Sequence, residues 1–143
     1  MFDKILVAVG GEDASLEPAR VAGQLAAAVG AQLSILSVAP ETDEALGEPL
    51  YSQRLDQRMA ESEAVLEEAR RLATEAGAAV TSIDTLEGRA AERITEFARH
   101  GGFSLIVLGT HRRGRFQSAL LGSVSATVAA HSDVPVLIVH EPH

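Results

Sequence analysis

The sequence predicts an α/β fold: a doubly wound parallel sheet of five strands in the order 3-2-1-4-5, with two helices on each face. Short apolar runs alternate with longer segments of helical period along the 143 residues, a pattern typical of parallel strands joined by crossover helices. With right-handed crossovers the winding reverses between the third and fourth strands, and such sheets bind ligands at the strand ends beside that reversal. The length predicts one domain, residues 1–143.

Five apolar runs are the predicted strands. Most of their residues are aliphatic or β-branched at successive positions, which is typical of strands that are covered on both faces. The runs are Lys4–Val9, Leu33–Val38, Ala79–Asp84, Ser104–Leu108 and Val134–Val139.

The segment between the first two strands predicts a helix, because its apolar residues recur at spacings of three and four. Pro18 fits only in the first turn of such a helix, so Ser15 is the predicted N-cap. The apolar residues with this period are Val21, Leu25, Ala28 and Val29.

A longer amphipathic helix is predicted from Leu50 to Ala76, with Gly77 as its stop. Its Glu and Arg residues are interpreted as a solvated face. Residues 39–49 hold two Pro, one Gly and four acidic residues without a period, which indicates a surface loop. The predicted apolar face consists of Leu55, Met59, Leu66, Ala69 and Ala73.

Two more helices are predicted from helical spacing, one after Gly88 and one after Gly114. The first ends at Gly101 and Gly102. Their apolar residues are Ala90, Ile94, Phe97 and Ala98 in the first, and Leu120, Leu121, Val124 and Val128 in the second.

Composition limits the classes of partner and of chemistry. The chain has 12 Lys and Arg against 20 Asp and Glu, and this net charge of -8 disfavours binding to nucleic acid or to anionic lipid. The absence of cysteine excludes disulfides, thiolate catalysis and Cys-ligated metal. No apolar run approaches the roughly 18 residues of a membrane span, and the first residues do not resemble a signal peptide, so we expect a cytoplasmic protein.

The segment after the fourth strand, residues 109–124, is the strongest candidate for a binding site. It contains three Arg and three Gly and leads into a predicted helix. Free backbone N–H groups and the positive end of a helix dipole favour a phosphate group there. The alternative interpretation is that the glycines only close turns and the arginines remain solvated.

This segment resembles the universal stress protein family, whose nucleotide-binding members carry G-x-x-G-x9-G-[ST] after the fourth strand. Gly109 matches the first glycine, and Gly122 with Ser123 matches the final pair. The resemblance extends along the whole chain, through the segments KILVAV, EGRAAERI, SLIVLGTH, LLGSVS and VPVLIV.

The chain departs from the family pattern at two positions. Arg112 stands where the motif has its second glycine, and Gly10 stands where nucleotide-binding members usually have an Asp near the nucleoside. The resemblance implies that the glycine segment holds phosphate and that the backbone near Val38 meets the base. At the departure, the guanidinium of Arg112 is able to donate hydrogen bonds to phosphate oxygens and so add charge to the site. The candidate nucleotide-binding residues are Gly10, Val38, Gly109, Thr110, Arg112, Gly122, Ser123 and Val124.

Two functions remain open at this point. The first is a regulatory module of stress response or signalling that binds ATP or a related adenine nucleotide, with or without Mg²⁺. The second is a dimeric interaction protein that binds no nucleotide because the motif is incomplete. We expect no enzymatic activity, since an enzyme would need a nucleophile or a base at this site, only His111 and Ser123 are available, and no acid is present to orient the histidine. The family resemblance and the apolar last strand predict a homodimer that pairs through that strand.

Overall fold

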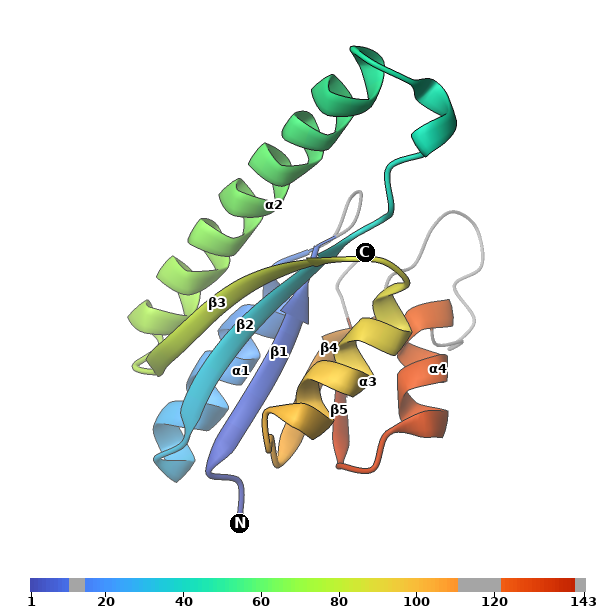
Figure 1. Ribbon diagram of the computed structural model, residues 1–143. Coiled ribbons are helices and arrows are strands. Elements are labelled where there is room, and N and C mark those ends of the chain that lie inside the picture. Colours follow the sequence, from blue (N-terminus) through green and yellow to red (C-terminus); the bar gives the residue numbers. More distant parts are fainter. Residues whose placement is uncertain (11–14, 111–121, 141–143) are drawn as a thin grey trace.

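The computed structural model describes residues 1–10, 15–110 and 122–140, and within them the strands form one parallel sheet in the order β3-β2-β1-β4-β5 (Figure 1). The predicted strand order is therefore confirmed. β1 lies at the centre, and β3 and β5 lie at the two edges. The strands are β1 (Lys4–Val9), β2 (Gln32–Ala39), β3 (Ala79–Glu87), β4 (Leu105–Gly109) and β5 (Val136–Val139).

Only β1 has its predicted bounds. β2 is one residue longer than predicted at each end, β4 is shifted by one residue, and β3 and β5 differ by two or more residues. β3 continues to Glu87 because it keeps pairing with the end of β2, where Leu86 lies opposite Val38. β5 starts two residues later than predicted: the N–H of Val134 donates to the hydroxyl of Ser132 in a turn (3.1 Å), and Pro135 has no N–H to donate.

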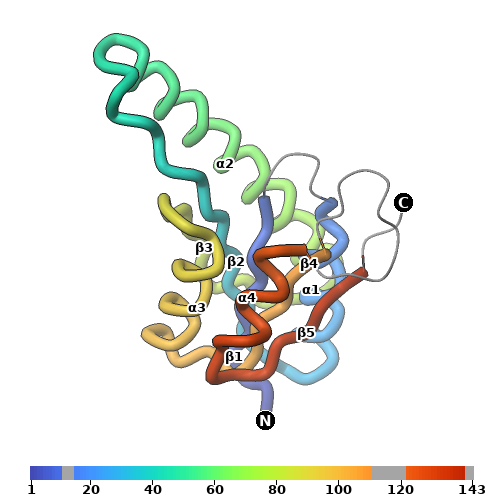
Figure 2. The backbone as a smooth tube through the Cα atoms, turned by 90° about the vertical axis from the view of Figure 1, so that its right-hand side faces the viewer, coloured from blue at the N-terminus to red at the C-terminus, as the bar shows by residue number. Residues whose placement is uncertain are grey.

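Two helices cover each face of the sheet, as predicted (Figure 2). α1 and α2 contact each other on one face, and α3 and α4 contact each other on the other face. In the described part of the chain the helices are α1 (Glu17–Val29), α2 (Leu50–Glu75), α3 (Ala90–His100) and α4 (Ser123–His131), with a short 3-10 helix, η1 (Glu44–Leu46), before α2.

The predicted N-cap of α1 was wrong by one residue, because Leu16 occupies that position. With Ser15 as N-cap, Pro18 would be the third helical residue and would offer no N–H to the serine hydroxyl. The hydroxyl of Ser15 instead accepts a hydrogen bond from the N–H of Glu17 (3.0 Å). Pro18 lies in the first turn, as expected.

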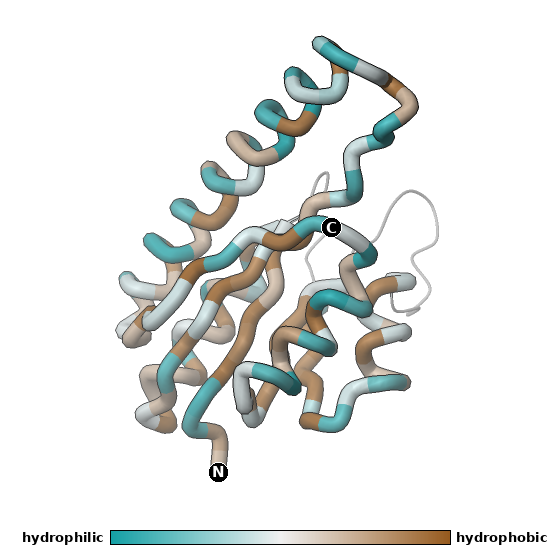
Figure 3. The backbone as a smooth tube through the Cα atoms, viewed as in Figure 1, coloured by the Kyte–Doolittle hydropathy of each residue, from teal (hydrophilic) through white to brown (hydrophobic). Residues whose placement is uncertain are grey.

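The core consists of two layers that flank the apolar strands at the centre of the molecule (Figure 3). Large aliphatic side chains come from the strands, whereas α1 and α2 contribute mainly alanines, so these helices approach each other closely. A Cβ atom added to Gly23 of α1 would lie only 2.8 Å from the Cα of Ala73 in α2. The layer on the other face includes Leu36, Ile94, Phe103 and Val128.

α2 is longer than the sheet that it covers and extends past the strand ends (Figure 1). The predicted apolar face is buried at Leu66, Ala69 and Ala73. Leu55 is only half-buried and Met59 is 36% exposed, because the sheet no longer lies beneath this end of the helix. The charged face is solvated, as interpreted from the sequence. No helix of the described residues is long and apolar enough to cross a bilayer.

Candidate functional site

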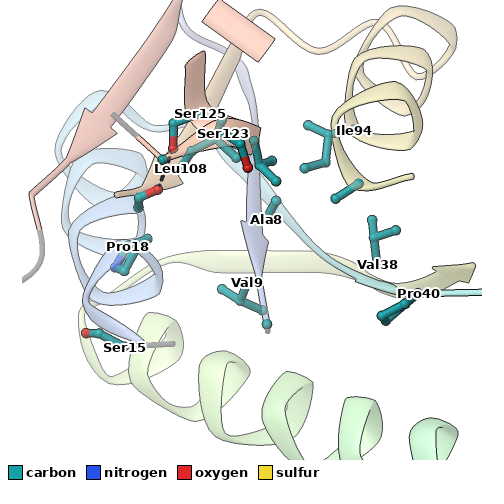
Figure 4. Close-up of a pocket in the computed structure, with 15 residues that line it drawn as sticks. Ala8, Val9, Ser15, Pro18, Val38, Pro40, Ile94, Leu108, Ser123 and Ser125 are labelled. Atoms are coloured by element: carbon teal, nitrogen blue, oxygen red, sulfur yellow. Dashed lines mark hydrogen bonds between the residues drawn. The ribbon is translucent and has the colours of Figure 1, made fainter. Parts of the chain in front are cut away.

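A cavity of about 300 Å³ opens where β1, β2 and β4 end (Figure 4). The cavity lies at the carboxyl ends of the strands, beside the point between β1 and β4 where the winding of the sheet reverses. This is where the sequence predicts a ligand site. The described lining residues are Ala8, Val9, Gly10, Ser15, Pro18, Val38, Pro40, Ala90, Ile94, Leu108, Gly109, Gly122, Ser123, Val124 and Ser125.

One wall of the cavity is apolar. Figure 4 shows Val38, Pro40 and Ile94 on one side of the end of β1, and Ser15 and Pro18 on the other. Arg58 of α2 donates from Nη1 to the carbonyl oxygen of Pro40 (3.1 Å), which holds the segment after β2 in place. A flat apolar group fits against this wall.

The opposite wall is the first turn of α4, which begins at Ser123 with Gly122 as N-cap. The first backbone N–H groups of a helix have no intrahelical partner, and no side chain of the described residues caps them at this helix start. The hydroxyl of Ser125 donates to the carbonyl oxygen of Gly109 (2.7 Å), which joins this first turn to the end of β4 (Figure 4). The helix start is thereby fixed beside the cavity, where the helix dipole favours an anion.

None of the described lining residues carries a charged side chain. The first turn of α1 also contains the acidic residue Glu17, whose carboxylate is paired with Arg20 (Nε to Oε2, 3.0 Å). The hydrogen bond from Arg20 lowers the pKa of Glu17 below its usual value. In this part of the site, backbone amides and serine hydroxyls therefore provide the polar contacts.

Six of the eight predicted site residues line the cavity: Gly10, Val38, Gly109, Gly122, Ser123 and Val124. Thr110 does not line it. This residue is fully buried, and its N–H donates to the carbonyl oxygen of Val139 in β5 (3.1 Å). Arg112 and His111 lie outside the described residues.

Several lining residues were not predicted as part of the site. Ala90 and Ile94 were assigned to the helix core, and Pro40 to a surface loop. Two of them follow strand ends: Pro40 comes directly after β2, and Ala90 starts α3 three residues after the end of β3. Position just after a strand is therefore the signal that would have found these two, whereas Ile94 lies further along α3.

At Gly10 the backbone φ is +119°, a conformation that side chains rarely adopt. A Cβ atom at this position would lie 2.9 Å from the hydroxyl oxygen of Ser37. That hydroxyl is buried and shares a hydrogen bond with the hydroxyl of Ser62 in α2 (3.1 Å). The backbone at the end of β1 thus favours glycine at the position where, by the family resemblance, nucleotide-binding members usually have an Asp.

The comparison with known proteins decides the family. A model of the universal stress protein family matches residues 1–140. The chain belongs to the universal stress protein family. A universal stress protein of Thermus aquaticus is 37% identical over 139 residues, which are 97% of this chain and 99% of that protein. The Bacillus subtilis universal stress protein YxiE is 35% identical over 148 residues, with 97% and 99% covered.

A solved structure gives the same result. The crystal structure of a universal stress protein in complex with cAMP is 30% identical and superposes with a TM-score of 0.75, covering 99% of this chain and 98% of that one. The family resemblance inferred from the sequence motifs is therefore confirmed over almost the whole length.

Proposed function

We propose that this universal stress protein binds an adenine nucleotide, ATP or a related one, in the cavity at the ends of β1 and β4. The observation that carries the proposal is the pairing of an apolar wall with an uncapped helix start across one cavity. A base fits the apolar wall at Val38 and Ile94, and phosphate oxygens accept from the amides at Ser123 and Val124. A relative that is 30% identical was crystallised with cAMP, which supports this ligand class.

The protein acts as a regulatory module of the stress response that signals through occupancy of the site, not as an enzyme. The described lining offers serine hydroxyls but no His, Asp or Glu that would serve as a general base. One of those hydroxyls, that of Ser125, already donates to Gly109. Participation of Mg²⁺ stays a prediction.

Thermal unfolding with and without nucleotide tests the proposal. A ligand at 100 times its Kd stabilises the native state by about 2.7 kcal/mol, so millimolar ATP with magnesium is expected to raise the melting temperature. The same scan with AMP, cAMP and GTP ranks the ligands. No shift with any adenine nucleotide would contradict the proposal.

The variant Val124→Glu is expected to weaken nucleotide binding about tenfold or more, because it places a carboxylate beside the position of the phosphate. Val124 is 38% exposed and lines the cavity, so the substitution needs no repacking of the core. A carboxylate in the first turn of a helix is itself favourable by about 0.3–1 kcal/mol, so the ligand-free protein keeps its stability.

Ala126→Glu is the matched control for this variant. Ala126 is exposed in the same turn of α4 but is absent from the cavity lining. The variant Ala126→Glu therefore carries the same added charge on another side of the helix. Isothermal titration of both variants checks the difference, and equal affinities would mean that the phosphate lies elsewhere.

We also propose that the protein is a homodimer paired through β5. The alternative function, a dimeric interaction protein that binds no nucleotide, predicts the same dimer. β5 is an edge strand of four residues, and its Leu137 is 37% exposed. An apolar edge leaves backbone N–H and C=O groups open to pairing.

Sedimentation at micromolar concentration is expected to give about 30 kDa, twice the 15.0 kDa of the chain. The variant Leu137→Lys places a charge on the edge and on its symmetry mate, so it is expected to shift the protein to monomers. A wild-type monomer at high concentration would overturn the dimer. A dimer without any nucleotide-dependent stabilisation would favour the nucleotide-free alternative.

A further inference from the structure

The edge strand β3 has a long open side. It pairs only with β2 among the described residues, and it spans nine residues, Ala79–Glu87. The register shifts between Leu33 and Ser34 of β2, which leaves Thr81 as an extra residue in a bulge. Beyond the bulge, Ser82–Glu87 pairs regularly and contains neither Pro nor Lys, the residues that commonly protect an edge. Every second residue of this stretch turns its backbone N–H and C=O groups to the open side and is available for pairing.

A second cavity lies beside this open stretch, and its volume is about 470 Å³. It is formed by the end of β3 and by one side of α3, which lie next to each other in Figure 1. Leu86 and Phe97 give it an apolar floor, and Phe97 is held by stacking on Phe103 with ring centres 5.8 Å apart. The lining residues are Leu86, Glu87, Arg93, Glu96, Phe97, His100 and Gly101. None of them lines the cavity proposed for nucleotide.

The strand register places Asp84 and Leu86 on the side of the sheet that α3 covers. Asp84 lies opposite Leu36 and Leu86 opposite Val38, and both of these β2 residues pack in the core layer that contains α3. Asp84 and Leu86 therefore face the same side, two residues apart.

The second cavity and the adjoining strand edge Ser82–Glu87, which includes Asp84, are together called the groove, and they carry more negative than positive charge. Arg93 is already paired with Glu96, from Nη1 to Oε2 at 3.1 Å. Among the ion pairs of the described residues, none involves Asp84 or Glu87. A basic side chain therefore complements this groove better than an acidic one.

We propose that β3 and α3 form a docking groove for an extended peptide of a partner protein, which adds to the sheet as a strand beside Ser82–Glu87. Main-chain hydrogen bonds to the open edge provide affinity, and side chains at alternate positions provide specificity. An apolar side chain enters the cavity floor at Leu86 and Phe97. A Lys or Arg two residues away in the peptide faces Asp84, because side chains two apart share one face of a strand. The proposal is independent of nucleotide binding.

The test uses the full chain labelled with ¹⁵N and three synthetic hexapeptides in a threonine background. The first carries Leu and Lys two residues apart, the second carries Leu and Glu at the same positions, and the third repeats the first with N-methylated backbone amides. The first is expected to shift the amide resonances of Ser82–Glu87 and of Arg93–Gly101. The second is expected to bind at least about tenfold more weakly, and the third is expected not to bind, because its backbone donors are lost.

Charge reversal separates the proposal from nonspecific adhesion. Asp84→Lys is expected to make the Glu peptide the tighter ligand, whereas Asp56→Lys, at an exposed position of α2, leaves the preference unchanged. If Asp84→Lys does not fold, Asp84→Asn is expected to remove the preference without reversing it.

Three results would overturn the proposal. They are peptide shifts confined to the nucleotide cavity, binding that does not depend on Asp84, and shifts of the β3 resonances with protein concentration alone, which would make a second copy of this chain the occupant.

Discussion

Gly23→Val is expected to destabilise the protein by about 3 kcal/mol, because it inserts a branched side chain where two helices touch. At this position of α1 a Cβ atom would meet the Cα of Ala73 at 2.8 Å and its carbonyl oxygen at 2.9 Å. Both atoms belong to the backbone of α2, so no side chain can turn aside. The helices must separate, and the alanine contacts between them are lost.

The melting temperature measures this effect and is expected to fall by about 10 °C for a domain of this size. Gln24→Val is the matched control, since it changes the next residue of the same helix at an exposed position. Its cost is limited to helix propensity, about 0.5 kcal/mol. If both variants lose the same stability, the close contact of α1 and α2 does not exist in solution.

Gly10→Asp is expected to destabilise the fold by about 2–4 kcal/mol, although it introduces the residue that nucleotide-binding relatives usually carry. The φ of +119° at this position strains any side chain, and the new Cβ would lie 2.9 Å from the hydroxyl oxygen of Ser37. That hydroxyl cannot move freely, because it shares a buried hydrogen bond with Ser62.

A double-mutant cycle measured by chemical denaturation tests the cause. Gly10→Ala is expected to show most of the loss, since it adds the same Cβ without a charge. Combining Gly10→Ala with Ser37→Gly is expected to recover the stability lost to the contact between the new Cβ and the serine hydroxyl. The stability lost to the positive φ is not recovered, so the effects of the two substitutions are non-additive. A Gly10→Asp protein as stable as wild type would mean that the end of β1 adopts another conformation.

The same geometry fits the first departure from the family pattern, glycine at position 10. With glycine at position 10, the described part of the cavity offers a ligand the start of α4 and apolar contacts but no carboxylate. The start of α4 is held by the hydrogen bond from the hydroxyl of Ser125 to the carbonyl oxygen of Gly109. This hydrogen bond does not involve position 112, where the motif has its second glycine. Nucleotide affinity of the wild type and of Val124→Glu therefore tests the contribution of that wall directly.

The order of the strands and the location of the cavity follow from the sequence by itself. The spacing of apolar residues along the chain is a local property. Continuous apolar runs such as Lys4–Val9 therefore indicate strands, and the helical spacing around Ile94 indicates a helix, without knowledge of their neighbours in space. Right-handed crossovers then leave only a few arrangements, and in the doubly wound one Gly10, Gly109 and Gly122 meet where the central strands end. The glycine motif likewise indicated the family before any comparison.

Only the tertiary structure decided which side chains face that cavity and which face the core. Thr110 stands beside Gly109 in the sequence, yet pairing with β5 buries it. Ala90 reaches the cavity because of how α3 packs on the sheet. The open side of β3 and its groove against α3 also depend on that packing. Such positions are set by distances between elements far apart in the chain, and the side-chain volumes that determine those distances leave no period in the sequence.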